Sequence, residues 1–186
     1  MRVNYSWSVA GGATYAGTQW LALIVLARLG TPEYVGAYAL ALAITAPIFL
    51  FTSLKLRNLQ ATDTADQFTF AEYFGLRIIM TAAAAFVVVV LSAFSGYKNT
   101  ILIGILLVAL ATCFEALSDI FYGLFQQRER MDRLSVSRML KGLLSIVALA
   151  VVLKLTGSLV AALASYAAVW AITLIAYDVP TGIRML

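Results

Sequence analysis

Residues 100–125 read TILIGILLVALATCFEALSDIFYGLF, a run of 26 residues in which only Glu115 and Asp119 carry a charge. A membrane-spanning helix needs about 20 mostly apolar residues to cross a hydrocarbon core ~30 Å thick. Backbone N–H and C=O groups find no water in that core, so a segment that crosses it must be helical. The run therefore predicts a transmembrane helix over Thr100–Phe125. Five further segments resemble it in length and composition: Trp7–Leu29, Tyr34–Leu56, Phe74–Phe94, Arg138–Leu155 and Ser158–Tyr177.

The overall composition agrees with this pattern. The 186 residues are 62% hydrophobic and 12% charged, and the mean hydropathy is +0.92. These values exclude a soluble globular domain. We predict an all-α, polytopic membrane protein, a bundle of six transmembrane helices over residues 1–178 with a short cytoplasmic tail over 179–186. Six spans with short connections leave no room for a soluble domain.

The residue types argue against catalysis. The chain has no histidine and a single cysteine, Cys113, which lies inside an apolar run. A general base, a metal site or a disulfide is therefore not expected. No phosphate-cradling glycine loop or nucleophile triad is present in the sequence. We expect neither an enzyme nor a cofactor or metal.

The basic residues predict the orientation. If the amino end is cytoplasmic, ten Lys and Arg side chains fall on the inside and three, Arg28, Lys98 and Lys154, on the outside. This bias favours both termini in the cytoplasm. The net charge of +4 is thereby explained by topology, and we expect no nucleic-acid partner. The inside set is Arg2, Lys55, Arg57, Arg77, Arg128, Arg130, Arg133, Arg138, Lys141 and Arg184.

Two helix boundaries carry clear signals. In the first connection, Gly30 suits a left-handed helix end, Thr31 an N-cap and Pro32 a first helical turn. Before the third segment, Thr69 and Glu72 have the spacing of a capping box. We therefore predict a turn of helix at the membrane interface before the third segment, and the alternative is a disordered loop.

Four polar side chains share one face of the fourth segment. Glu115 and Asp119 are four residues apart, and Tyr122 and Gln126 continue the face at spacings of three and four. An acid inside a span costs ~2.5–3.5 kcal/mol on insertion scales and usually faces a bundle interior. These residues are candidates for lining a polar cavity open to the cytoplasm. The alternative is an interfacial position with pairing to Arg128 or Arg130.

The fifth segment strengthens the cavity hypothesis. Only twelve residues separate Lys141 from Lys154, about 18 Å of helix, which is too short for a span. One lysine must therefore snorkel or enter a polar interior. Lys154 lies next to a turn, whereas Lys141 is within reach of Glu115 or Asp119.

Three other residues are weaker candidates. Arg77, early in the third segment, has the chemistry to bind a phosphate group with two hydrogen bonds, although the interfacial position is slightly favoured. Gln19 either lines the cavity or hydrogen-bonds a neighbouring helix. Pro47, in the middle of the second segment, is either a transport hinge or a fixed bend.

Small residues in the first segment predict helix packing. Ser8, Gly12 and Ala16 are spaced four apart, and Ala13 and Gly17 form a second such pair. Small side chains at this spacing allow helix backbones to approach closely.

Several stretches resemble a known family. They are LARLGTPEYVG at 26–36, AITAPIF at 43–49, and EALSDIFYGLFQQ at 115–127 running on into ERMDR at 129–133. In order and spacing these resemble bacterial O-antigen-flippase-like polysaccharide transporters of the multidrug/oligosaccharidyl-lipid/polysaccharide exporter superfamily, and the resemblance extends to about Asp178. It implies a protein of the bacterial cytoplasmic membrane that moves a lipid-pyrophosphate-linked oligosaccharide outward by alternating access. Basic cavity residues would meet the pyrophosphate, here Arg77 or Lys141.

The family pattern has two six-helix lobes, whereas this chain matches the first lobe only. The resemblance therefore implies a half-transporter that acts as a parallel homodimer or with a separate second lobe, or a truncated form. Alternatives are a non-transporting membrane subunit or inactive remnant, and a small dimeric exporter of drugs or metabolites. A nearby gene for a second lobe would favour the first reading, and a frameshifted downstream frame would favour the remnant.

Overall fold

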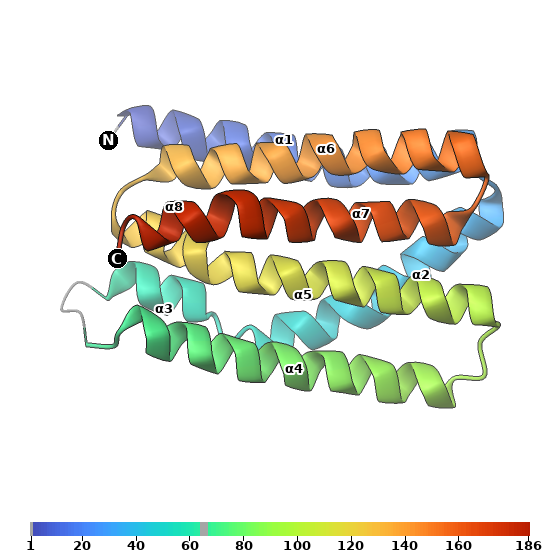
Figure 1. The fold of residues 1–186 in the computed structure, drawn as a ribbon, viewed down its shortest axis with the longest axis horizontal. Coiled ribbons are helices and arrows are strands. Elements are labelled where there is room, and N and C mark those ends of the chain that lie inside the picture. Colours follow the sequence, from blue (N-terminus) through green and yellow to red (C-terminus); the bar gives the residue numbers. More distant parts are fainter. Residues whose placement is uncertain (1, 64–66) are drawn as a thin grey trace.

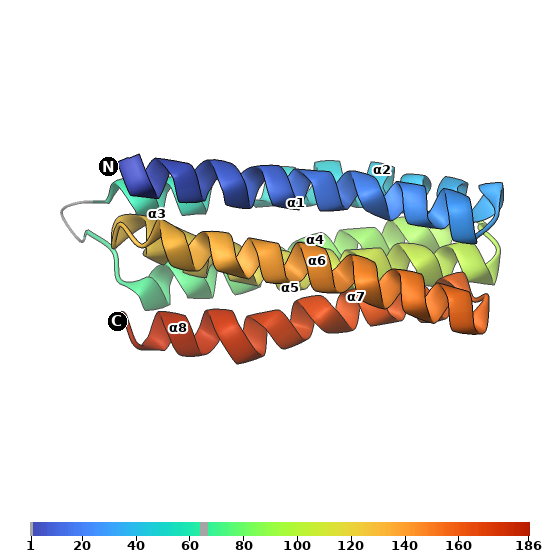
Figure 2. The same ribbon diagram turned by 90° about the horizontal axis from the view of Figure 1, so that it is seen from above.

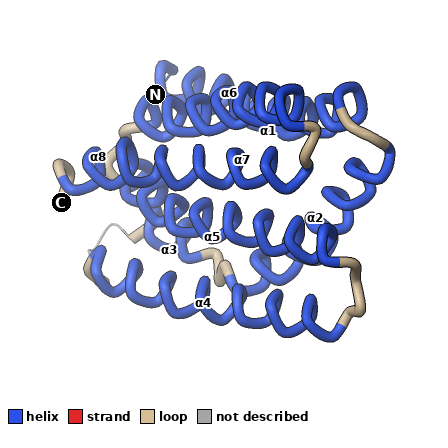
Figure 3. Tube along the Cα trace, turned by 45° about the vertical axis from the view of Figure 1, so that its right-hand side comes forward, coloured by secondary structure: helices blue, strands red, loops and turns tan. Residues whose placement is uncertain are grey.

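A computed structural model describes residues 2–63 and 67–186, and within these ranges the chain is all helical. Figure 1 shows the long helices lying side by side, and Figure 3 shows short loops joining them. The elements are α1 (Arg2–Leu29), α2 (Pro32–Thr52), α3 (Leu56–Thr62), α4 (Phe70–Phe94), α5 (Asn99–Gln127), α6 (Met131–Thr156), α7 (Leu159–Thr173), the π-helical turn η1 (Leu174–Asp178) and α8 (Val179–Ile183).

The predicted fold class is confirmed. Six helical stretches are long and apolar enough to cross a membrane, counting α2 with α3 as one and α7 with η1 and α8 as another. The described amino end, the carboxyl end and α3 all lie at one end of the bundle (Figure 1). Residues 179–183, expected as part of a tail, continue the last span as helix α8, and Gly182 is buried there.

The second segment is interrupted where a continuous helix was predicted. α2 ends at Thr52, and Leu54 and Lys55 take the left-handed conformation with φ of 46° and 49°. Such a conformation costs a non-glycine residue roughly 1–2 kcal/mol, so tertiary contacts must hold it. The Ser53 carbonyl beside the break accepts a hydrogen bond from Arg77 Nη1 at 3.4 Å. The chain then turns into α3, which packs against α5.

The helix-boundary predictions had mixed outcomes. The capping box is confirmed, because Glu72 N donates to Thr69 Oγ1 at 3.4 Å and Thr69 N donates to Glu72 Oε2 at 2.7 Å. Thr31 is the N-cap of α2, but its side chain makes no capping bond. The left-handed conformation expected at Gly30 is wrong, since the described glycines with positive φ are Gly96 and Gly157. Gly30 instead avoids a clash, because a Cβ there would lie 2.7 Å from the Leu26 carbonyl oxygen and from Tyr34.

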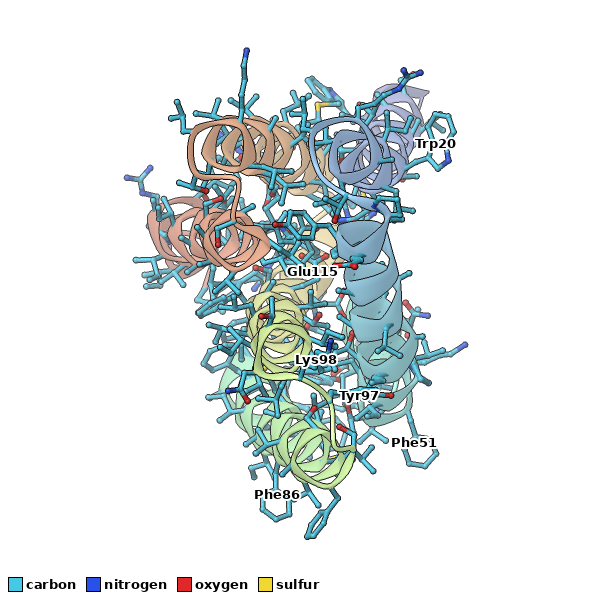
Figure 4. The ribbon with its side chains drawn as sticks, turned by 90° about the vertical axis from the view of Figure 1, so that its right-hand side faces the viewer. Trp20, Phe51, Phe86, Tyr97, Lys98 and Glu115 are labelled. Atoms are coloured by element: carbon cyan, nitrogen blue, oxygen red, sulfur yellow. The ribbon has the colours of Figure 1, made fainter. Side chains whose placement is uncertain are left out.

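Helix α5 lies at the centre of the bundle and packs against α2, α3, α4 and α7. α6 packs against α1 and α7 and lies between them in the view of Figure 2. α5 joins this group of helices to α2, α3 and α4. The core between them consists of buried aliphatic and aromatic side chains such as Leu26, Ile105 and Leu163. Large apolar side chains including Trp20, Phe51 and Phe86 point outward from the rim of the bundle (Figure 4), as expected for a surface in contact with lipid.

The close approach of α1 to α6 uses other glycines than those predicted. Gly12 and Gly17 face open space, so the predicted ladders do not contact a neighbouring helix through them. The contact lies at Gly11, where an added Cβ would be 2.8 Å from Ser135 Cα, and at Gly142, which packs against Thr18. One residue corresponds to about 100° of rotation around the helix axis. The predicted set of small residues, which contains Gly12, therefore lies on a different face of α1 from Gly11.

Candidate functional site

The acids of α5 lie inside the bundle. In the end-on view of Figure 4, Glu115 lies between α5 and α2, whereas Trp20, Phe51 and Phe86 lie at the rim. Glu115 and Asp119 are partly exposed, and Tyr122 is fully buried. The predicted polar face of α5 therefore points toward other helices, and its side chains divide into two connected ion-pair clusters.

The first cluster centres on Asp119. Its Oδ2 accepts a hydrogen bond from Arg77 Nη2 at 2.6 Å, and its Oδ1 accepts one from Arg57 Nη1 at 3.3 Å. Arg77 comes from α4 and Arg57 from α3, so three helices meet at one carboxylate. Both hydrogen bonds are charge-assisted, which makes them stronger than neutral ones.

The break between α2 and α3 positions Arg57. The turn at Leu54 and Lys55 brings α3 against α5. Arg57 Nε then donates to Gln126 Oε1 at 2.7 Å, about two turns beyond Asp119 on the same face. Gln126 thus fixes the orientation of a guanidinium group, and with it the second partner of Asp119.

The second cluster centres on Lys141, whose side chain is fully buried. Its Nζ lies 3.3 Å from Glu115 Oε2 and 3.3 Å from Asp178 Oδ2, and it donates to the Tyr122 hydroxyl at 2.9 Å. The contact with Glu115 is one of the two that the short fifth segment suggested. Lys141 makes no ion pair with Asp119 in the described part of the chain.

The turn η1 brings Asp178 into this cluster. Five residues of π-helix end at Asp178, and local π-helical geometry often occurs at functional sites. The Asp178 carboxylate accepts a hydrogen bond from Ser137 Oγ at 2.5 Å, and that hydroxyl also lies 2.9 Å from the Tyr122 hydroxyl. The fully buried Asp178 is therefore held by two side chains of α6, Ser137 and Lys141.

Tyr122 connects the two clusters. Arg57 lies 5.7 Å from the centre of its ring, Arg138 lies 5.5 Å away, and Lys141 Nζ lies 5.1 Å away. Each distance suits a cation–π contact. Arg138 Nε is buried without a hydrogen-bond partner, as is Arg77 Nε. In the described part of the chain, three cations thus pair with three carboxylates, a fourth, Arg138, lies over the Tyr122 ring, and two of the guanidinium groups keep an unused donor.

Sequence reasoning missed three of these residues. Arg57 and Arg138 were counted only as topology signals, and Asp178 only as the end of the six-helix lobe. The alternative pairing of the α5 acids with Arg128 or Arg130 is wrong for Asp119, because Arg57 and Arg77 hold it, while Arg130 pairs with Asp132. Arg57 and Asp178 each lie one residue beyond a predicted segment, so a search for charges within the segments does not find them.

The two remaining candidates lie outside the clusters. Gln19 Nε2 donates to the Tyr166 hydroxyl at 3.1 Å, which links α1 to α7 as in the packing alternative. Pro47 lies inside α2, which remains helical from Pro32 to Thr52. Within the described residues no group of three or more His, Cys, Asp or Glu side chains is arranged to hold a metal ion.

Comparisons with known proteins give one informative match. A capsular polysaccharide biosynthesis protein, CapF of Staphylococcus aureus, is 38% identical to this chain over 148 residues, which make up 77% of the chain and 35% of the relative. The chain thus spans about a third of the length of the curated relative it matches. No family model and no solved structure matches the chain.

Proposed function

We propose that this chain takes part in moving a lipid-linked oligosaccharide across the bacterial cytoplasmic membrane during synthesis of a surface polysaccharide. It would do so as one six-helix lobe that works together with a second such lobe. The likeness to a capsular polysaccharide biosynthesis protein supports the pathway. The resemblance of residues 26–36 and 115–133 to polysaccharide transporters supports the transport step.

The observation that carries the proposal is the excess of cations inside a membrane bundle. Arg57, Arg77 and Lys141 pair with three carboxylates, and Arg138 lies over the Tyr122 ring. Among the described residues the Nε atoms of Arg77 and Arg138 are buried without a hydrogen-bond partner. Charged groups within spans are costly and usually mark a substrate or ion pathway. Guanidinium groups bind phosphate oxygens through two parallel hydrogen bonds. An anionic diphosphate linking lipid to sugar is a ligand of fitting charge and chemistry.

Complementation tests the proposal. The chain is expressed in a strain that lacks its O-antigen flippase, alone and together with a second six-helix lobe, and surface polysaccharide is measured on gels. We expect restored polysaccharide in at least one arm, and its loss in the variant Arg77→Gln.

The matched control is Arg130→Gln, which removes an exposed arginine paired with Asp132 outside the cluster. This variant should rescue as well as the unmodified chain. Absence of rescue in both arms, with the protein present in the membrane, would contradict transport and favour a non-transporting subunit.

A further inference from the structure

We propose that Asp119 sets the minimum negative charge that a ligand needs to bind at the cationic site formed by Arg57 and Arg77. With this charge threshold the site accepts a diphosphate and rejects the singly charged phosphodiester of bulk phospholipid. The inference rests on the proposed function and assigns a specificity-determining role to one carboxylate. In the structure Asp119 occupies the place that a ligand phosphate would take between two arginines.

The geometry of Asp119 imitates a phosphate. Each carboxylate oxygen accepts from a different guanidinium, Arg77 at 2.6 Å and Arg57 at 3.3 Å. A phosphate group presents two oxygens to two guanidinium groups in the same way. An anion that binds these arginines must therefore displace Asp119 from at least one of them.

The exposure of the three side chains indicates from which side a ligand can reach the site. Arg77 is only 3% exposed, and its other hydrogen bond holds the Ser53 carbonyl, so it is a fixed part of the site. The Asp119 side chain is 28% exposed and that of Arg57 is 16% exposed. A ligand approaching from the accessible side thus meets Asp119 and Arg57 first, with Arg77 as the anchor behind them.

The charge balance produces the threshold. A monoanion that replaces Asp119 exchanges one tethered negative charge for one free negative charge, and it loses translational freedom in the process. A diphosphate brings at least two negative charges and more acceptor oxygens, so it can pair with both arginines at once and with more charge than the carboxylate that it displaces. Since the bilayer itself supplies phosphodiesters in large excess, such a threshold keeps the site free for the substrate.

The test is a binding measurement on the purified chain in detergent by isothermal titration calorimetry at pH 7. The probes are inorganic pyrophosphate and dimethyl phosphate, a monoanion with the chemistry of a phospholipid phosphodiester. We expect the unmodified chain to bind pyrophosphate and not dimethyl phosphate. The variant Asp119→Asn should bind pyrophosphate about tenfold more tightly and should acquire measurable binding of dimethyl phosphate.

The matched control is Asp132→Asn. Asp132 also lies between two arginines, Arg130 at 3.0 Å and Arg133 at 3.4 Å, but at the end of the bundle. Its loss should leave the affinity for both probes unchanged. Equal pyrophosphate affinity in Asp119→Asn and the unmodified chain would overturn the inference.

A further variant separates the two proposals. If Arg57→Gln does not weaken pyrophosphate binding, the phosphate site of the proposed function is itself contradicted. If it weakens binding while Asp119→Asn does not strengthen it, only the threshold fails.

Should Asp119→Asn not fold, infrared difference spectroscopy on the unmodified chain with isotope-labelled aspartate gives the same decision. Pyrophosphate should shift the band of a salt-bridged aspartate carboxylate. An unchanged spectrum at saturating pyrophosphate would overturn the threshold.

Discussion

Lys141 and Asp178 have fully buried side chains and lie 3.3 Å apart. Removing one partner of a buried pair leaves a bare charge, at a cost of about 3–5 kcal/mol. We therefore expect Lys141→Met to lower the free energy of unfolding by about 3 kcal/mol. The double variant Lys141→Met with Asp178→Leu should lose less than Lys141→Met alone, because no fully buried carboxylate is left without its partner, and Glu115, the other partner of Lys141, is partly exposed. Unfolding monitored by circular dichroism in detergent measures both changes.

Lys154 is the control for this experiment. It belongs to the same helix, but its side chain is exposed in the last turn of α6. Lys154→Met should change stability by no more than about 0.5 kcal/mol. A double variant as unstable as the sum of its single variants would show that the pair is not energetically coupled.

At this scale, sequence identified the acids and Lys141 because charges in apolar runs are conspicuous. It did not identify their partners. Asp119 pairs with Arg57, 62 residues away in sequence, and with Arg77, 42 residues away. Such pairing depends on how α3 and α4 pack around α5, which local patterns do not encode.

Helix packing offers a prediction at the scale of elements. Gly11→Ala should force α1 away from α6, because the added Cβ would lie 2.8 Å from backbone atom Cα of Ser135. Overpacking of this kind costs about 1–3 kcal/mol. Gly12→Ala, at a position with open space beside it, is the matched control and should be neutral or slightly stabilising. Thermal unfolding of both variants compares them, and equal melting temperatures would disprove the α1–α6 contact.

The start of α4 gives a second prediction for an element. Thr69→Ala removes the side chain that caps α4, and we expect a loss of about 1 kcal/mol. Thr69→Ser keeps the hydroxyl and should retain most of that stability. Thermal unfolding measures the stability of both variants. Equal melting temperatures of the alanine and serine variants would contradict the capping role of the Thr69 hydroxyl.

Local signals explain which elements were predictable. The Thr69 and Glu72 capping box is complete within four residues, so sequence was sufficient. The break at Leu54 and Lys55 was not predictable, because neither residue favours positive φ. Arg77, more than twenty residues away, supports that break through the Ser53 carbonyl. An element held by a distant side chain leaves no mark in its own sequence.

The whole molecule predicts a topology that can be measured. Ser95 lies in the connection from α4 to α5, and Arg130 in the connection from α5 to α6, at opposite ends of the bundle (Figure 1). In a Cys113→Ala background, Ser95→Cys should react with an impermeant thiol reagent applied from outside. Arg130→Cys should react only after the membrane is permeabilised. The opposite labelling pattern would reverse the orientation that the ten-to-three distribution of basic residues favours.

For the whole molecule, the sequence was most informative about the number of membrane spans and least informative about how the helices are arranged. Span length fixes six crossings through the thickness of a bilayer. The central place of α5 follows from side-chain packing between distant segments, to which hydropathy is insensitive. The cationic site could be anticipated in part because its acids lie on α5, the helix that the other elements surround.

The pairing of Arg77 with Asp119 also bears on how the chain is made. Ribosomes deliver α4 to the insertion machinery before α5, so Arg77 enters without its carboxylate. Its insertion cost of ~2.5–3.5 kcal/mol must be offset by the aliphatic remainder of α4, whose mean hydropathy reaches 2.4. Nascent α4 is therefore expected to stay in contact with the translocon until Asp119 has left the ribosome. A polypeptide that stops after Phe94 should leave this arginine facing lipid and be cleared by membrane proteases faster than one that includes α5.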